Sequence, residues 1–244
     1  MSGPATRRAP LTVGVLGGMG PMATVEAFRR ITAITPAHSD QEHLHVFVDS
    51  DPSIPDRTRA LLHGGEDPRP KLLASGRRLI DAGAELICLP CNTSHAFYEW
   101  LQERIDVPIV HMVDEAATAA RKRAKGSLCG LLATSGTAAT GIYATALHHV
   151  GLEIALPGAE HQRAVHESIS VIKAGGSLDD AAALCAESVD ALLADGATML
   201  ILGCTELSLI ADRLGHTAQV VDALQAMAEA TVDIALGRRA AVSL

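Results

Sequence analysis

Two stretches of this chain, 113 residues apart, follow one pattern: a glycine, a short apolar run, then a cysteine followed by small polar residues. The first stretch is Gly83–Thr93 and places Cys91 after its apolar run. The second is Gly196–Glu206 and places Cys204 there. Two halves that each present a thiol at the end of a strand can bring those thiols face to face, one on each side of a substrate.

A second pair of segments repeats in the same order. Gly14–Pro21 corresponds to Gly130–Thr137 at an offset of 116 residues, close to the offset of the cysteines. Two similar offsets indicate an internal duplication and therefore two halves of related fold.

Apolar runs alternate with amphipathic stretches along the chain, which predicts parallel strands covered by helices. The strands are expected at 11–16, 44–49, 85–90, 108–112, 127–133, 152–156, 198–203 and 219–222. The helices are expected at 21–35, 68–83, 94–105, 114–124, 138–150, 160–175, 178–196 and 223–237. The fold class is α/β, with two pseudo-symmetric domains that each hold a mainly parallel four-stranded sheet flanked by helices. We assign 10–117 to the first domain and 118–216 to the second, and expect 217–244 to pack back onto the first.

Composition excludes several classes of partner. The net charge is −8 and the chain has no basic run, so neither nucleic acid nor a membrane is an expected partner. Residues 1–10 lack the apolar stretch of a secretory signal, and no window has the length of a membrane span. The odd number of cysteines, five, fits a reducing cytoplasm better than a disulfide framework.

The cysteines divide into two groups by position. In open parallel sheets, ligands bind beyond the carboxyl ends of the strands, which is where Cys91 and Cys204 lie. Cys88 and Cys129 fall inside predicted strands and Cys185 inside a helix, so these three are expected to be small buried hydrophobic residues.

Other chemical interpretations fit less well. Cys88 and Cys91 have C-x-x-C spacing, but a redox motif of that kind opens a helix, and a zinc site needs a second pair that is lacking. The glycine loop at 17–20 does not have the G-x-G-x-x-G spacing of a dinucleotide site. Its glycines, like the hydroxyl-rich loop at 134–137, suit an anion such as a carboxylate. His95 lies near the same edge and is an alternative catalytic group.

Four motifs together resemble the aspartate/glutamate racemase superfamily, with the aspartate racemase branch the nearest match. They are Gly17-Gly18-Met19-Gly20-Pro21, Ile54-Pro55-Asp56-Arg57-Thr58, Pro90-Cys91-Asn92-Thr93-Ser94-His95 and Leu202-Gly203-Cys204-Thr205-Glu206-Leu207. The resemblance extends over nearly the whole chain. Glutamate racemases usually open with Asp-Ser-Gly and carry histidine after the second Cys-Thr, so the opening loop and Glu206 fit that branch less well.

The resemblance implies an active site in the interdomain cleft, a homodimer, and no pyridoxal phosphate, metal or nucleotide. It implies two-base racemisation of an acidic amino acid, L-aspartate to D-aspartate above others. Cys91 and Cys204 are the catalytic residues: one, as thiolate, removes the α-proton, and the other, as thiol, protonates the opposite face. An ordinary thiol has a pKa near 8.5, so the site must favour thiolate at one position.

The predicted substrate-binding residues surround these cysteines. They are Gly18, Met19, Gly20, Arg57, Asn92, Thr93, Thr134, Ser135, Thr137, Lys173, Thr205 and Glu206. Arg57 and Lys173 match the cations of the family, and a guanidinium suits a carboxylate. Asp49 and Asp51 add negative charge near the site, where they would orient Arg57 or bind the substrate ammonium.

Three alternatives stay open at this point. The first is a racemase of glutamate or another amino acid on the same fold. The second, from a different class, is a two-lobed protein that binds a small ligand without turnover. The third is a nucleotide-binding oxidoreductase.

Overall fold

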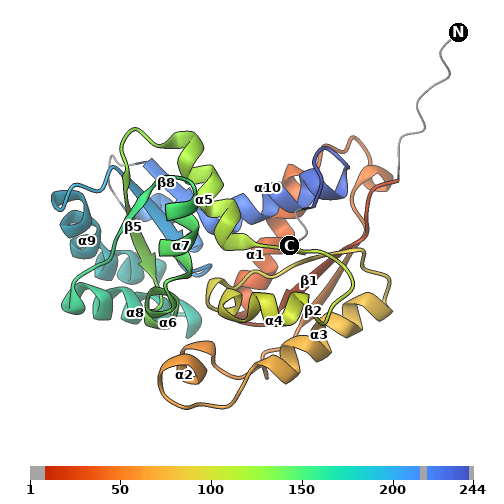
Figure 1. Ribbon diagram of the computed structural model, residues 1–244, viewed down its shortest axis with the longest axis horizontal. Helices are drawn as coiled ribbons and strands as arrows, with labels where there is room; N and C mark the ends of the chain where they lie inside the picture. The colour runs from red at the N-terminus through yellow and green to blue at the C-terminus, as the bar shows by residue number, and fades with distance from the viewer. Residues whose placement is uncertain (1–8, 215–218, 242–244) are drawn as a thin grey trace, which may run out of the picture.

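The structure, a computed structural model, describes residues 9–214 and 219–241 and contains two four-stranded parallel sheets (Figure 1). The eight strands are β1 (Val13–Gly17), β2 (Val46–Ser50), β3 (Leu86–Cys88), β4 (Ile109–Val110), β5 (Leu128–Ala133), β6 (Glu153–Ala155), β7 (Met199–Gly203) and β8 (Gln219–Asp222). Each coincides with a predicted strand. The sheet orders are β2-β1-β3-β4 and β6-β5-β7-β8, all parallel. The second order is the first displaced by four strands, which confirms the predicted pair of related halves.

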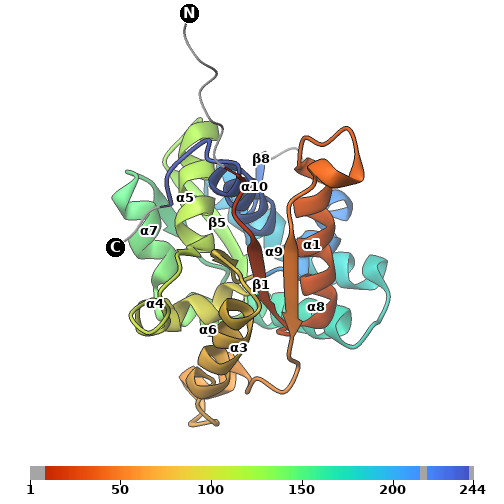
Figure 2. The same ribbon diagram turned by 90° about the vertical axis from the view of Figure 1, so that its right-hand side faces the viewer.

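Helices cover both faces of each sheet. They are α1 (Pro21–Ile34), α2 (Arg57–Leu62), α3 (Arg69–Asp81), α4 (Tyr98–Gln102), α5 (Met112–Arg123), α6 (Ser135–Thr140), α7 (Ile142–His149), α8 (Ala159–Lys173), α9 (Leu178–Ala194) and α10 (Ala223–Ala235), with short 3₁₀ turns at Asp40–Glu42, Asn92–Phe97, Leu207–Leu209 and Ala211–Arg213. In the first half, α1 and α3 lie on opposite sides of β1 (Figure 2).

Three helix predictions were wrong in detail. The helix expected at 94–105 is a 3₁₀ segment, Asn92–Phe97, followed by the short α4. The helix expected at 138–150 is broken at Gly141, whose φ of 70° ends α6 in the left-handed region. The third concerns residues 57–62, where no helix was expected: they form α2, whose start is capped by the Asp56 carboxylate accepting from the Arg59 N–H.

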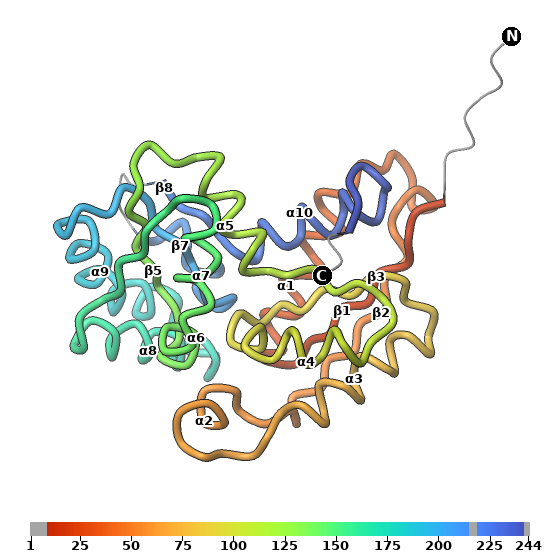
Figure 3. Tube along the Cα trace, in the orientation of Figure 1, coloured from red at the N-terminus to blue at the C-terminus, as the bar shows by residue number. Residues whose placement is uncertain are grey.

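One hydrophobic cluster joins the two halves. Val15 of β1 and Ile201 of β7 belong to the same buried cluster, together with Ala117 of α5 and Met227 of α10. Within the C-terminal segment that was expected to return to the first half, α10 runs beside α1 and α5 (Figure 3), whereas β8 pairs with β7 in the second sheet. Residues 217–218 and 242–244 of the predicted returning segment lie outside the described residues, and the domain boundaries themselves stay predictions.

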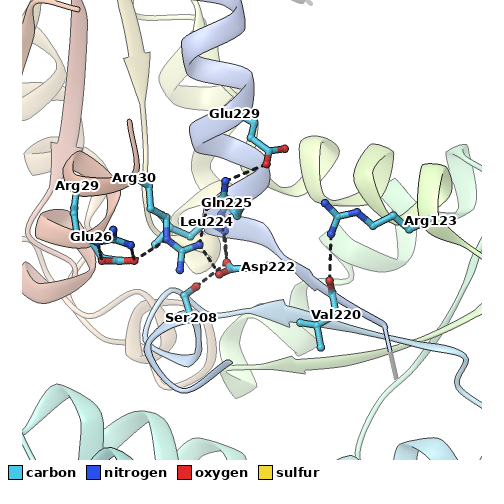
Figure 4. A network of polar contacts seen from close by, with 10 residues as sticks. All are labelled: Glu26, Arg29, Arg30, Arg123, Ser208, Val220, Asp222, Leu224, Gln225 and Glu229. Carbon is cyan, nitrogen blue, oxygen red and sulfur yellow. Dashed lines mark hydrogen bonds and ion pairs between the residues drawn. The ribbon is translucent and has the colours of Figure 1, made fainter. Parts of the chain in front are cut away.

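A polar network ties the halves together at the start of α10 (Figure 4). Asp222, at the end of β8, accepts from Arg30 of α1 at 2.5 Å and from Ser208 at 2.7 Å. Arg30 also donates to Glu26, at 2.7 Å. Hydrogen bonds from Arg29 and Arg30 lower the pKa of Glu26 to about 2, in spite of its partial burial. The Arg30–Asp222 pair is largely shielded from solvent, so removing either partner would leave a buried charge uncompensated.

Candidate active site

Cys91 and Cys204 line one cavity between the two halves. Each follows the strand at the equivalent position of its sheet, β3 and β7, and each side chain is only 5% exposed. The cavity has about 300 Å³ of empty space, open solvent at its mouth included. Its lining residues are Met19, Asp56, Arg57, Thr58, Cys91, Asn92, Thr93, Thr134, Lys173, Cys204, Thr205 and Glu206.

Most of the predicted site residues therefore lie around this cavity. Gly18 and Gly20 instead line an adjoining, wider cavity of about 920 Å³, which shares Arg57, Lys173 and Glu206 with the first. Ser135 and Thr137 line neither of the two cavities. Sequence reasoning missed Asp56 and Thr58 as lining residues, although both belong to the Ile54–Thr58 motif already singled out.

The backbone of the glycine loop is held by the protein itself. The Gly18 N–H donates to Thr24 Oγ1 at 2.8 Å, so this amide is not free for a substrate anion. Gly18 has φ of 93°, and a Cβ there would lie 2.3 Å from the Asp51 backbone. This position therefore needs glycine to let two loops approach, and the Gly18 amide is not one of the anion donors.

Arg57 is 7% exposed, and its guanidinium is partly used by backbone carbonyls. Nη1 donates to Ile54 O and Pro55 O at 3.2 and 3.0 Å, and Nη2 donates to Met19 O at 3.1 Å. Nε is buried and has no hydrogen-bond partner among the described residues. A guanidinium has five N–H donors, so Nε and one hydrogen of Nη2 are left. These two adjacent donors form a fork that matches a carboxylate.

Asn92 supplies a second unused donor. Its Oδ1 accepts from the buried Tyr143 hydroxyl at 2.6 Å, which fixes the amide across the two halves. Its Nδ2 is buried and finds no partner in the part of the chain that the structure describes, although Asn92 lines the cavity. A buried donor without a partner costs free energy, which a substrate oxygen would recover.

Three hydroxyls form a ring between the halves beside Asn92. Thr93 Oγ1 lies 3.0 Å from Thr134 Oγ1 and 2.9 Å from Thr137 Oγ1, and the latter two are 3.0 Å apart. Thr134 also caps α6 by accepting from the Thr137 N–H. Thr137 does not line the cavity itself, but its hydroxyl holds Thr93 and Thr134, which do.

Cys204 has an acidic neighbour. Its Sγ donates to Glu206 Oε2 at 3.0 Å, and Lys173 Nζ lies 4.0 Å from Glu206 Oε1. Burial and the Glu206 carboxylate raise the pKa of Cys204 well above the ordinary value. Burial alone would lower the pKa of Lys173, but Glu206 and the two cysteines raise it, so Lys173 stays a cation.

The remaining three cysteines are buried away from the cavity, as predicted. Cys88 lies in β3, Cys129 in β5 and Cys185 in α9, and all are free thiols. Burial raises the pKa of Cys88 to about 12, so it stays protonated. Within residues 9–214 and 219–241, no group of three or more His, Cys, Asp or Glu side chains is placed to hold a metal ion.

Asp49 and Asp51 do not play the predicted part. Asp49 accepts from Arg78 at 2.7 Å and from Ser75, and Asp51 accepts from Arg78 at 3.3 Å. Neither carboxylate lines the cavity. Their partner is Arg78 of α3 rather than Arg57, because α3 packs against the end of β2.

His95 holds the backbone of Cys91 rather than facing the cavity. Its Nε2 accepts from the Met112 N–H at 3.0 Å, which leaves the proton on Nδ1, 3.0 Å from Cys91 O. Burial lowers the pKa of His95 to about 3. The imidazole is therefore neutral at pH 7, and it positions Cys91 through the hydrogen bond to its backbone carbonyl.

Acidification is expected to destabilise the protein through His95. The folded-state pKa lies below the unfolded value of about 6.5, so the stabilisation is complete above pH 6.5 and is lost as pH falls towards 3. At pH 5 the loss from this residue is about 2 kcal/mol. Urea unfolding at pH 7 and pH 5 measures it, and His95→Gln should flatten the dependence whereas the exposed His43→Gln should not. Equal slopes for wild type and His95→Gln would contradict the assignment.

The chain is similar to known proteins over most of its length. Residues 16–231 match the model of the Asp/Glu/Hydantoin racemase family. The chain is 26% identical over 224 residues to the broad specificity amino-acid racemase RacX of Bacillus subtilis, covering 90% of this chain and 96% of that protein. Among solved structures it is similar to Picrophilus torridus aspartate racemase, with 28% identity, a TM-score of 0.79 and coverage of 92% and 94%. An aspartate racemase homologue from Pyrococcus horikoshii has 25% identity, a TM-score of 0.74 and coverage of 92% and 98%. The described residues include no helix long and apolar enough to span a bilayer.

Proposed function

The chain belongs to the Asp/Glu/hydantoin racemase family, and from this premise we propose that it racemises aspartate without a cofactor, with Cys91 and Cys204 as its two proton-transfer residues. The observation that carries the proposal is the placement of these two thiols, one from each half, on the same small cavity. Racemisation needs a proton acceptor on one face of the α-carbon and a donor on the other. Two equivalent strand ends on opposite halves supply that pair.

Each step moves one proton. The thiolate takes the α-proton, and the electron pair of the broken C–H bond spreads onto the α-carboxylate. The opposite thiol then gives its proton to the α-carbon, which leaves the first sulfur as thiol and the second as thiolate. Donors at the carboxylate stabilise the developing negative charge. The unpartnered Arg57 Nε and Asn92 Nδ2 are the candidates that the cavity offers.

Aspartate is favoured by charge and size. The cavity is lined by two cations, Arg57 and Lys173, which suit the two carboxylates of a dicarboxylic amino acid. Its narrow interior suits a small substrate.

A second candidate is a racemase of glutamate or another, larger amino acid. The adjoining cavity of about 920 Å³, whose lining includes Met22, Ile54 and Ile172, provides space for a longer or more apolar side chain. The similarity of the chain to a broad specificity amino-acid racemase also supports this alternative.

Proton exchange measured by NMR in D₂O tests the function directly. With L-aspartate and no added cofactor, we expect deuterium at the α-carbon together with D-aspartate. Exchange with L-glutamate or other amino acids but not aspartate would keep the mechanism and move the substrate. Tight ligand binding without exchange of any amino acid would favour the two-lobed binding protein and contradict the proposal.

The homodimer and the cytoplasmic location also stay proposals. For the dimer, Met22, Val25 and Phe28 expose apolar side chains on α1, and light scattering of the purified protein measures the assembly. For the location, the mechanism requires both thiols reduced, as the cytoplasm keeps them. Fractionation of the source cells checks it.

A further inference from the structure

Glu206 is a buried carboxylate placed directly on one of the two reacting sulfurs. It is 3% exposed, and its Oε2 accepts from Cys204 Sγ at 3.0 Å. Its other oxygen, Oε1, lies 4.0 Å from Lys173 Nζ. Thr205 Oγ1 is at 3.4 Å from Oε2, a marginal distance. The Cys204 thiol is thus the closest donor to this carboxylate among the described residues.

The internal repeat shows that this arrangement is one-sided. Glu206 stands two residues after Cys204, and the equivalent position after Cys91 is Thr93. Thr93 is neutral, and its hydroxyl is bound to Thr134 and Thr137. Across the described chain, no hydrogen bond joins the Cys91 sulfur to a carboxylate. The two thiols of an otherwise symmetric site therefore differ by one negative charge.

The Glu206 carboxylate, 3.0 Å from the Cys204 sulfur, favours the thiol form of Cys204 over its thiolate form. It accepts the S–H hydrogen bond of the thiol but repels a thiolate, and burial strengthens both effects. Lys173 offsets the charge only in part, because its ammonium lies 4.0 Å from Oε1 with no hydrogen bond to it, whereas the sulfur lies 3.0 Å from Oε2 and donates to it.

We propose that Glu206 is a positioning residue that keeps the proton on Cys204 in the free enzyme, so that Cys204 is the proton donor and Cys91 the base of the first proton transfer. The inference rests on the proposed two-cysteine racemisation. In this order Cys91 takes the α-proton and Cys204 delivers its own to the opposite face. The cycle closes when the Cys91 thiol loses its proton to water and the Cys204 thiolate takes one from water. Glu206 drives this return by disfavouring the Cys204 thiolate.

The pH dependence of alkylation tests the assignment, because iodoacetamide reacts with the thiolate and not with the thiol. The rate is followed on the Cys204 peptide by mass spectrometry, which separates it from the other four cysteines. Glu206→Gln keeps the shape and removes the charge. We expect Cys204 in this variant to react about tenfold faster or more at pH 7.5, with its midpoint shifted down by about one pH unit or more. Glu160→Gln, on the exposed start of α8, is the matched loss of one carboxylate and should leave the rate unchanged.

The inference is overturned if Cys204 alkylates with the same pH midpoint in wild type and Glu206→Gln. Glu206→Asp, which retains the charge, should keep the midpoint close to that of wild type, and a shift as large as that of the glutamine variant would equally contradict the charge argument. If iodoacetamide does not reach the thiol, ultraviolet thiolate absorbance of Cys91→Ala, with and without Glu206→Gln, reports the same ionisation. Circular dichroism confirms that each variant is folded.

The kinetic consequence separates this inference from the function itself. In Glu206→Gln, the pH optimum of kcat should move to lower pH, and Glu206→Asp should restore part of the lost activity at the original optimum. A wild-type protein that exchanges no α-proton, yet shows the shifted alkylation, would sink the proposed racemase and keep the thiol–carboxylate pair. An active racemase with an unmoved Cys204 midpoint would do the reverse.

Discussion

Replacing either Cys91 or Cys204 by alanine is expected to reduce racemisation by about a thousandfold or more. Each thiol is the proton-transfer group on one side of the cavity, and removing a general acid or base typically costs a factor of about 10²–10⁴. Among the described residues that line the cavity there is no third cysteine to replace the lost thiol. Circular dichroism of the D-aspartate formed, at matched protein concentration, measures the effect.

The two single variants should also differ from each other. Each still holds one sulfur, so each is expected to exchange the α-proton of one enantiomer in D₂O while failing to convert it. Cys185→Ala is the matched control, because Cys185 is fully buried in α9 and does not line the cavity. Full racemisation by either active-site variant would rule out two-base chemistry.

Replacing Arg57 by lysine is expected to lower kcat/KM for aspartate by about 10- to 100-fold. Lysine keeps the positive charge but has no fork, so the pair of donors left free on Arg57 is lost. A charge-assisted hydrogen bond is worth about 1.5–3 kcal/mol, and each 1.4 kcal/mol is a factor of ten. Initial rates over a range of aspartate concentrations separate the effect on KM from that on kcat.

The control for Arg57 lies two residues away. Arg59 is on the same short helix and is exposed, so Arg59→Lys should leave kcat/KM unchanged. Thermal melting shows whether loss of the bonds to Met19, Ile54 and Pro55 also weakens the loop. An Arg57→Lys enzyme that is stable and has wild-type kinetics would mean that Arg57 is only structural.

The sheet architecture was predictable because two features that indicate it, the apolar runs and their repetition, can be read from the sequence. Buried parallel strands appear as apolar runs, and the duplication repeats those runs in order, so all eight strands and the equivalence of Cys91 and Cys204 follow from the sequence. The helix breaks were less visible. Gly141 ends one helix and starts the next without any proline, and α2 depends on a cap that Asp56 makes only in the folded loop.

The side-chain contacts around the site could not be predicted from the sequence. Asp49 and Asp51 are close to Arg57 in sequence but pair with Arg78, which α3 brings to them. The Gly18 amide has the geometry of an anion donor but is occupied by Thr24. The sequence predicts Glu206 to be a substrate-binding residue, and only the structure shows that its carboxylate accepts a hydrogen bond from Cys204. Each of these three contacts depends on the direction in which a side chain points, which the sequence pattern does not give.

The buried cluster that contains residues of both sheets gives this duplicated chain a property that neither copy holds alone. Val15 and Ile201 share this cluster with Met227 of α10, and the ion pair of Arg30 with Asp222 joins α1 of the first half to the end of β8 in the second. A half separated from the other would expose this cluster to water, at a cost that a small domain cannot carry. The two halves, symmetric in outline, are therefore expected to unfold together rather than one at a time.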